Sequence, residues 1–210
     1  MFYRFLFVLF ISFNVWAQDS YIDYASPYHP TINQRGMVVS QNIDSSKIGI
    51  EILDMGGNAI DAAVAVGFSL AVTLPRAGNL GGAGFMLVYL KERDEIVAVD
   101  YLGSSPRNSN IQDLFGVKLP RNYEKADRDI VRYGYKASTV PGTVAGLLEA
   151  HANFGRLPLS SVLKPVIEQA RNGIKVSYDL YMALKSSSQL KRDKESRKIF
   201  FNNGSAVAEN

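Results

Sequence analysis

The sequence has 210 residues, of which 47% are hydrophobic and 20% charged, and its formal net charge is +3. These values are typical of a chain that packs a globular core, and they exclude an intrinsically disordered protein. The net charge is too small to indicate nucleic-acid binding, so no nucleic-acid partner is predicted. The absence of cysteine excludes disulfides, thiolate metal sites and a cysteine nucleophile.

The first 17 residues differ in composition from the rest of the chain. Arg4 is their only charge, an apolar run follows it, and Val15 and Ala17 stand at the −3 and −1 positions before Gln18. This pattern is typical of a secretory signal peptide over residues 1–17. The run is too short for a membrane span, which needs about 20 residues. A buried N-terminal helix is the alternative, and the lack of a cap disfavours it. We predict a periplasmic or secreted protein with no membrane anchor after cleavage.

A short apolar run at residues 36–40 predicts a buried strand, the first element of the mature chain. Asp44 is a suitable N-cap for a helix over residues 45–55. The pair Gly56-Gly57 ends that helix, because glycine adopts the left-handed conformation at little cost.

A second helix is predicted over residues 59–74, between Asn58 and Pro75. Asn58 and Asp61 have the three-residue spacing of a capping box. The helix is apolar nearly all round, which predicts burial on every side. Its alanines and Gly67 would let it lie close against a sheet.

The glycine-rich segment 78–84 precedes two predicted strands, at residues 85–90 and 95–101, which a short charged turn joins. Backbone N–H groups in such a run could bind an anion. Its place after a helix and before a strand is the reverse of the dinucleotide-binding arrangement. A tight turn between buried elements is the favoured interpretation.

An irregular polar stretch at residues 103–136 separates the predicted hairpin from further helices. Proline and glycine signals predict helices over residues 141–154 and 159–171. Residues 185–198 are rich in charge and predict one solvated helix. A strand, several helices and a hairpin together favour an α+β or layered α/β fold.

Few side chains in the sequence could carry chemistry. The two histidines, His29 and His151, belong to no metal-ligating cluster, and both are interpreted as surface residues. Neither a metal nor another cofactor is predicted. The Gly-x-Ser-x-Gly pattern of a nucleophile elbow is not present. Composition and spacing alone therefore assign no function.

Four segments nonetheless resemble the large subunit of the γ-glutamyltransferase family in their order and spacing. They read GGNAIDAAVAVGF, GNLGGAGF, VPGTVAGL and PVIEQARNGIKVS, at residues 56–68, 78–85, 140–147 and 165–177. The preceding SSKIGIEIL, residues 45–53, also fits, and the resemblance covers roughly residues 24–200. The first and third motifs are specific in combination, whereas the glycine run alone is a weak signal.

The resemblance implies an α+β fold of the N-terminal nucleophile hydrolase type, a four-layer αββα sandwich. It also implies a precursor that cleaves itself into a large and a small subunit. The new N-terminal threonine of the small subunit would attack the γ-glutamyl amide of glutathione or a similar donor. Water or an amino acid acceptor would then receive the γ-glutamyl group.

One departure from the family pattern concerns the catalytic nucleophile. The sequence ends at Asn210, where the large subunit of the family is only partly complete. No threonine of the chain stands in the family's processing motif, so no catalytic residue is assigned within it (Thr31, Thr73, Thr139 and Thr143). We therefore expect residues 18–210 to be the N-terminal part of a large subunit. This part would be inactive alone, and its partner would be a separately encoded C-terminal segment.

A second departure concerns substrate binding. The family pattern is Asp-Phe-Arg-Glu-x-Ala-Pro, and its arginine binds the α-carboxylate of the γ-glutamyl group. This chain reads DYLGSSP over residues 100–106, so Leu102 stands where the arginine is expected. Leucine supplies neither a charge nor a hydrogen-bond donor to a carboxylate. Arg107 is near in sequence but out of register.

Three functions remain open at this point. The first is a γ-glutamyltransferase or glutathione hydrolase to which this chain contributes. The second is an acylase of the same family with a substrate that needs no α-carboxylate contact. The third is an exported pseudoenzyme fragment that binds a partner without catalysis.

Overall fold

The computed structural model describes residues 32–109, 133 and 137–208. Residues 1–36 and 37–210 form two separate units, and the helices and strands below belong to the second. The predicted signal peptide at residues 1–17 and the side chain of His29 lie outside the described residues. Within the described ranges, no helix combines the length and the apolar character that a membrane crossing requires.

The first helix, α1 (Ile43–Asp54), begins two residues earlier than predicted. Its N-cap is Asn42, whose side chain accepts hydrogen bonds from two backbone N–H groups of the first turn. Asp44 lies inside that turn and pairs with Lys47 at 3.1 Å, so its assignment as the cap was wrong. At the other end Gly56 has φ +88°, the left-handed conformation that the sequence predicted.

The strand predicted at residues 36–40 is not formed. A strand needs a hydrogen-bonded neighbour, and each strand in the described part of the chain pairs within its own two-stranded sheet. Val38 of this segment packs against the core near Gly49 of α1 and Val66 of α2. Only Val38 among the large apolar residues of the run is partly buried, whereas Met37 and Val39 are 50% and 83% exposed.

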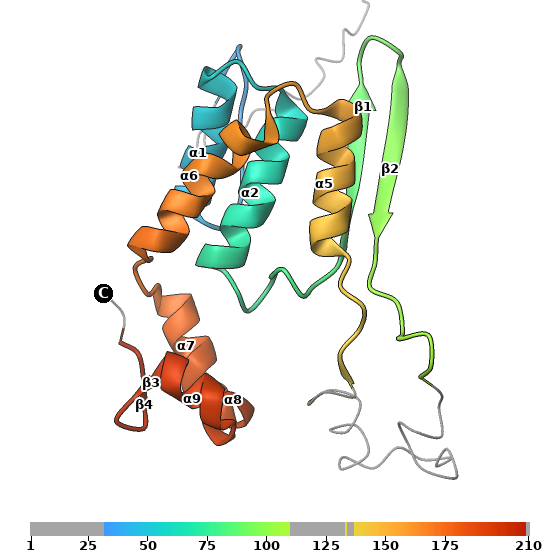
Figure 1. The fold of residues 1–210 in the computed structure, drawn as a ribbon. Helices are drawn as coiled ribbons and strands as arrows, with labels where there is room; N and C mark the ends of the chain where they lie inside the picture. The colour runs from blue at the N-terminus through green and yellow to red at the C-terminus, as the bar shows by residue number, and fades with distance from the viewer. Residues whose placement is uncertain (1–31, 110–132, 134–136, 209–210) are drawn as a thin grey trace, which may run out of the picture. The chain divides into compact units, whose positions relative to one another are not determined.

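Helix α2 (Ala59–Thr73) lies at the centre of the helical core, where it contacts α1 and two later helices, α5 (Thr143–Phe154) and α6 (Leu159–Asn172). In Figure 1 α5 lies on one side of α2, and α1 and α6 lie on the other. The small residues of α2 serve these helix contacts, whereas the sequence suggested contact with a sheet. A Cβ added at Gly67 would lie 3.1 Å from the side chain of Leu147 on α5. The prediction that α2 is buried on every side was wrong in detail, because two alanines at one edge are exposed (Ala59 and Ala63).

Strands β1 (Gly84–Leu90) and β2 (Glu95–Tyr101) form the predicted antiparallel hairpin, with Gly84 opposite Tyr101. One face of the hairpin packs on α5 and buries Val88 and Val99. The other face is apolar and between 59% and 75% exposed at each of its large side chains (Phe85, Leu87, Tyr89 and Ile96). A second sheet covers such a face in proteins built from stacked sheets.

The sequence predicted one helix over the charged residues 185–198, but the structure divides this segment among three short helices, the first of which begins before it. They are α7 (Tyr178–Ser186), α8 (Ser188–Arg192) and α9 (Lys194–Phe200), followed by the two-residue strands β3 (Phe201–Asn202) and β4 (Ser205–Ala206). Ser187 and Asp193 interrupt the helix, because each side chain accepts the N–H of a residue three positions later as an N-cap.

Candidate functional site

Two of the four motif segments, 78–85 and 140–147, meet the segment 100–106 at the carboxyl end of β2. The backbone N–H groups of Gly142 and Thr143 both donate to the carbonyl oxygen of Gly82, at 2.9 and 3.2 Å. The N–H of Val140 donates to the carbonyl oxygen of Ser104 at 2.8 Å. Segments 78–85, 100–106 and 140–147 are thus held in one loop cluster. Helix α5 begins at Thr143, with Gly142 as its N-cap, two residues after the predicted start.

The glycine-rich segment contains the predicted tight turn. The N–H of Gly82 closes a turn onto the carbonyl oxygen of Asn79 at 3.0 Å, and the N–H groups of Ala77 and Gly78 donate to the carbonyl oxygen of Leu74. Backbone hydrogen bonds at both ends of the segment thus hold the turn in place.

Leu102 lies in this loop cluster, one residue beyond the end of β2, and its side chain is 57% exposed. Its backbone N–H donates to Oδ1 of Asp100 at 3.0 Å. Arg107 lies five residues further on, exposed, in a turn that the N–H of Ser109 closes onto the carbonyl oxygen of Pro106 at 2.9 Å. The side chain that the cluster presents at position 102 is therefore apolar.

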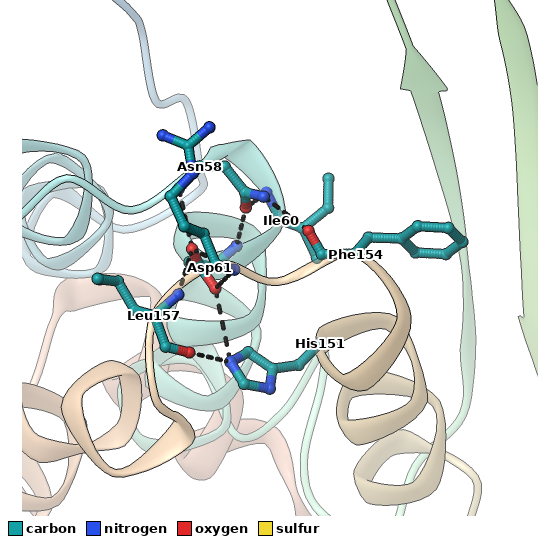
Figure 2. A network of polar contacts seen from close by, with 7 residues as sticks. Asn58, Ile60, Asp61, His151, Phe154 and Leu157 are labelled. Carbon is teal, nitrogen blue, oxygen red and sulfur yellow. Dashed lines mark hydrogen bonds and ion pairs between the residues drawn. The ribbon is translucent and has the colours of Figure 1, made fainter. Parts of the chain in front are cut away.

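A second cluster of polar side chains lies at the N-terminus of α2 (Figure 2). The carboxylate of Asp61 is fully buried. It accepts the N–H of Asn58 at 2.9 Å and so completes the predicted capping box. It also accepts the N–H groups of Arg156 and Leu157, at 3.0 and 3.2 Å, from the connection between α5 and α6. One carboxylate therefore joins the start of α2 to a segment 95 residues away.

Asn58 and His151 strengthen the same junction. Nδ2 of Asn58 donates to the carbonyl oxygen of Phe154 at 2.6 Å. Nε2 of His151 donates to the carbonyl oxygen of Leu157 at 2.9 Å and lies 3.5 Å from Oδ1 of Asp61. The His151 side chain is only 13% exposed, so the prediction of a surface histidine was wrong. Its burial follows from this carbonyl acceptor, which satisfies a ring nitrogen away from water.

The network around Asp61 is structural. Across the described residues, every buried side-chain nitrogen or oxygen has a hydrogen-bond partner, the carboxylate of Asp61 included. Those residues also contain no group of three or more histidine, aspartate or glutamate side chains that could hold a metal ion.

Sequence reasoning missed a buried hydroxyl cluster between α1, α2 and α6. Ser45 Oγ lies 2.9 Å from Thr73 Oγ1 and 2.8 Å from Ser69 Oγ, and the Ser69 hydroxyl contacts Oε1 of Gln169 at 2.7 Å. Ser45 and Ser69 are fully buried. Their hydroxyl groups therefore tie helices together and are not accessible nucleophiles. Polar residues at otherwise apolar helix positions are the signal that could have indicated them.

Comparison with known proteins decides the family. Residues 45–210 match the family model described as Gamma-glutamyltranspeptidase. The chain belongs to this family. It is 38% identical over 179 residues to the glutathione hydrolase proenzyme of Escherichia coli (strain K12), covering 84% of this chain and 30% of that relative.

Two further relatives extend the comparison. The crystal structure of Helicobacter pylori γ-glutamyltranspeptidase superposes with a TM-score of 0.77 at 34% identity, over 86% of this chain and 51% of that one. The acylase ACY 1 proenzyme of Pseudomonas sp. (strain V22) is 36% identical over 157 residues, covering 74% of this chain and 28% of that relative. An acylase proenzyme is thus among the proteins that are similar to this chain.

The predicted fold is confirmed by these structural neighbours. The described helices and the β1–β2 hairpin are an incomplete part of the N-terminal nucleophile hydrolase sandwich, an α+β fold. The chain spans about a third of the length of the curated relatives that it matches. The uncovered apolar face of the hairpin agrees with a partial sandwich.

Proposed function

We propose that residues 1–210 form the exported N-terminal part of an enzyme that cleaves γ-glutamyl amides and passes the γ-glutamyl group to water or an amino acid. The observation that carries this proposal is the convergence of two family motif segments, 78–85 and 140–147, on the loop that holds Leu102. The match to a glutathione hydrolase proenzyme supports glutathione as a substrate of the whole protein. Within residues 1–210 no threonine stands in the family's processing motif. The catalytic threonine would therefore come from a complementary segment, and this part alone would be inactive.

Leu102 should weaken the use of γ-glutamyl donors. The α-carboxylate of such a donor would meet an exposed leucine where the family has an arginine. Removing one partner of a desolvated charge pair costs about 2–5 kcal/mol. At about 1.36 kcal/mol per tenfold, this corresponds to roughly a 30- to 5,000-fold lower kcat/KM.

The same residue favours a second candidate function, that of an acylase in the same family. An acyl substrate without an α-carboxylate needs no cation at position 102, and leucine offers it apolar contact. The similarity to the acylase ACY 1 proenzyme supports this alternative. A third candidate, an exported partner-binding protein without catalysis, predicts no turnover of either substrate class.

A hybrid protein tests these candidates. The chain is joined to the remaining segment of the E. coli glutathione hydrolase proenzyme, with leucine, arginine or methionine at position 102. Self-cleavage is followed on gels, and kcat/KM is measured for γ-glutamyl amides and for acyl amides that lack the α-carboxylate. The methionine variant is the matched control, because it conserves side-chain volume and adds no charge.

We expect all three forms to cleave themselves, since that chemistry is local to the threonine. Leu102→Arg should raise kcat/KM for γ-glutamyl amides by at least about 30-fold, and Leu102→Met should not. A leucine form that already matches the arginine form would refute the site assignment and make Arg107 the next residue to test. A leucine form that prefers the acyl amides would identify an acylase. Loss of all turnover in self-cleaved hybrids would favour the non-catalytic protein.

A further inference from the structure

Tyr101 is enclosed by three glycines that belong to the family motifs. A Cβ added at Gly84, its partner across the hairpin, would lie 2.8 Å from Cε2 of Tyr101. A Cβ at Gly146 of α5 would overlap the ring itself, and a Cβ at Gly142 would overlap the Tyr101 carbonyl group. None of these three glycines has a positive φ. Glycine is therefore needed at these positions because a side chain would collide with Tyr101. The backbone conformation there would allow other residues.

Hydrogen bonds and close packing also hold the backbone at and after position 102. The N–H of Leu102 is bonded to Asp100, and the carbonyl oxygen of Ser104 accepts the N–H of Val140. A Cβ added at Gly103 would lie 2.5 Å from Oγ1 of Thr139, so this backbone is also closely packed. Position 102 thus combines a restrained backbone with an exposed side chain. Enzymes need this combination in a residue that contacts substrate, because small displacements of such contacts reduce rates strongly.

We propose that Tyr101 is a positioning residue: its ring, seated against Gly84 and Gly146, and its carbonyl group, packed against Gly142, fix the backbone from which residue 102 reaches the substrate. The inference rests on the proposed function only in placing residue 102 at the substrate site. The ring carries this role, because the phenolic hydroxyl makes a long hydrogen bond of 3.3 Å to the carbonyl oxygen of Phe85. Tyr101→Phe should therefore preserve the position of residue 102, whereas a methyl group at position 146 should displace the ring.

A spin label tests the positioning without any substrate. The 210 residues contain no cysteine, so Leu102→Cys gives one labelling site in them. The full-length protein is used, with any cysteine outside this range replaced. Electron paramagnetic resonance line shapes of a nitroxide at position 102 are then compared among the parent, Tyr101→Phe, Gly146→Ala and Gly67→Ala. Gly67→Ala is the matched control, because its methyl group would meet the flexible end of Leu147 on the same helix, α5.

We expect a restricted label in the parent, in Tyr101→Phe and in Gly67→Ala, and a several-fold shorter correlation time in Gly146→Ala. Far-UV circular dichroism checks that each variant retains its helices. A mobile label in the parent, or an unchanged line shape in a folded Gly146→Ala variant, would overturn the inference. Equal mobility in Gly67→Ala and Gly146→Ala would also overturn it, because the effect would then be general loosening of α5.

Kinetics of the Leu102→Arg hybrid separate this inference from the proposed function. Tyr101→Phe should leave kcat/KM for γ-glutamyl amides within about twofold, and Gly146→Ala should lower it at least tenfold. If the label responds as expected and no hybrid turns over a γ-glutamyl or acyl amide, the proposed function fails while the positioning of residue 102 stands.

Discussion

Replacement of Asp61 by alanine should release the connection between α5 and α6. The carboxylate is fully buried and accepts backbone N–H groups from Asn58, Arg156 and Leu157. Alanine removes the acceptor and leaves these three donors without their partner. The connection would then remain attached to α2 mainly through Asn58 Nδ2, which donates to the carbonyl oxygen of Phe154.

The size of the effect follows from the burial of Asp61. Each lost bond to a charged acceptor is worth about 1.5–3 kcal/mol, and breaking a buried charged network by removing one partner costs about 3–5 kcal/mol in total. At about 1.36 kcal/mol per tenfold, the open population of the connection should rise roughly 150- to 5,000-fold. An exposed pair such as Asp44 with Lys47 offers a control, since such pairs contribute about 0–1 kcal/mol.

Limited trypsin digestion measures this opening directly, because Arg156 is exposed and supplies a cleavage site within the connection. When opening is fast compared with cleavage, the cleavage rate follows the population of the open form. Cleavage after Arg156 is quantified by mass spectrometry in the parent, Asp61→Ala, Asp61→Asn and Asp44→Ala. We expect the rate to rise at least about 100-fold in Asp61→Ala, to rise less in Asp61→Asn, and to stay unchanged in Asp44→Ala.

A rise below threefold in a folded Asp61→Ala variant would refute the assignment of Asp61 as the main anchor of the connection. Equal acceleration of cleavage after Arg171 of α6 would also contradict it, because the whole helical core would then have loosened. The predicted pattern is local, since the donors that lose their partner lie at the start of α2 and in the α5–α6 connection.

Three further outcomes are expected. The intact mass of protein recovered from the periplasm or medium should correspond to a start at Gln18, and a cytoplasmic protein that retains residue 1 would contradict export. Gly49→Ala should destabilise the fold by about 1–3 kcal/mol in chemical denaturation, because the new Cβ would lie 2.7 and 2.8 Å from two valine side chains, whereas Gly78→Ala meets nothing within 4 Å and should change little. Burial raises the pKa of the Tyr101 phenol above its ordinary value. As the pH rises, the unfolded state therefore loses this proton before the folded state does. The free energy of unfolding that the neutral phenol contributes is present below about pH 10 and declines above it. Tyr101→Phe should lessen that decline.

Local sequence signals determined much of the secondary structure. Asn58 and Asp61 predicted the start of α2, and Gly56 predicted the end of α1, because caps involve groups only a few residues apart. Two strand-like runs joined by a short charged turn predicted the hairpin to within one residue. At residues 36–40 the same kind of reasoning failed, because an apolar run does not show whether a neighbouring strand is present to pair with it.

The sequence alone also indicated the family and placed Leu102 where its arginine is expected, since motif order and register can be read without a structure. Only the tertiary structure showed that Asp61 accepts hydrogen bonds from Arg156 and Leu157, that His151 is buried, and that glycines from two motifs enclose Tyr101. These contacts join residues that are distant along the chain. They depend on how the helices and the hairpin pack together, and no spacing within a single segment encodes that packing.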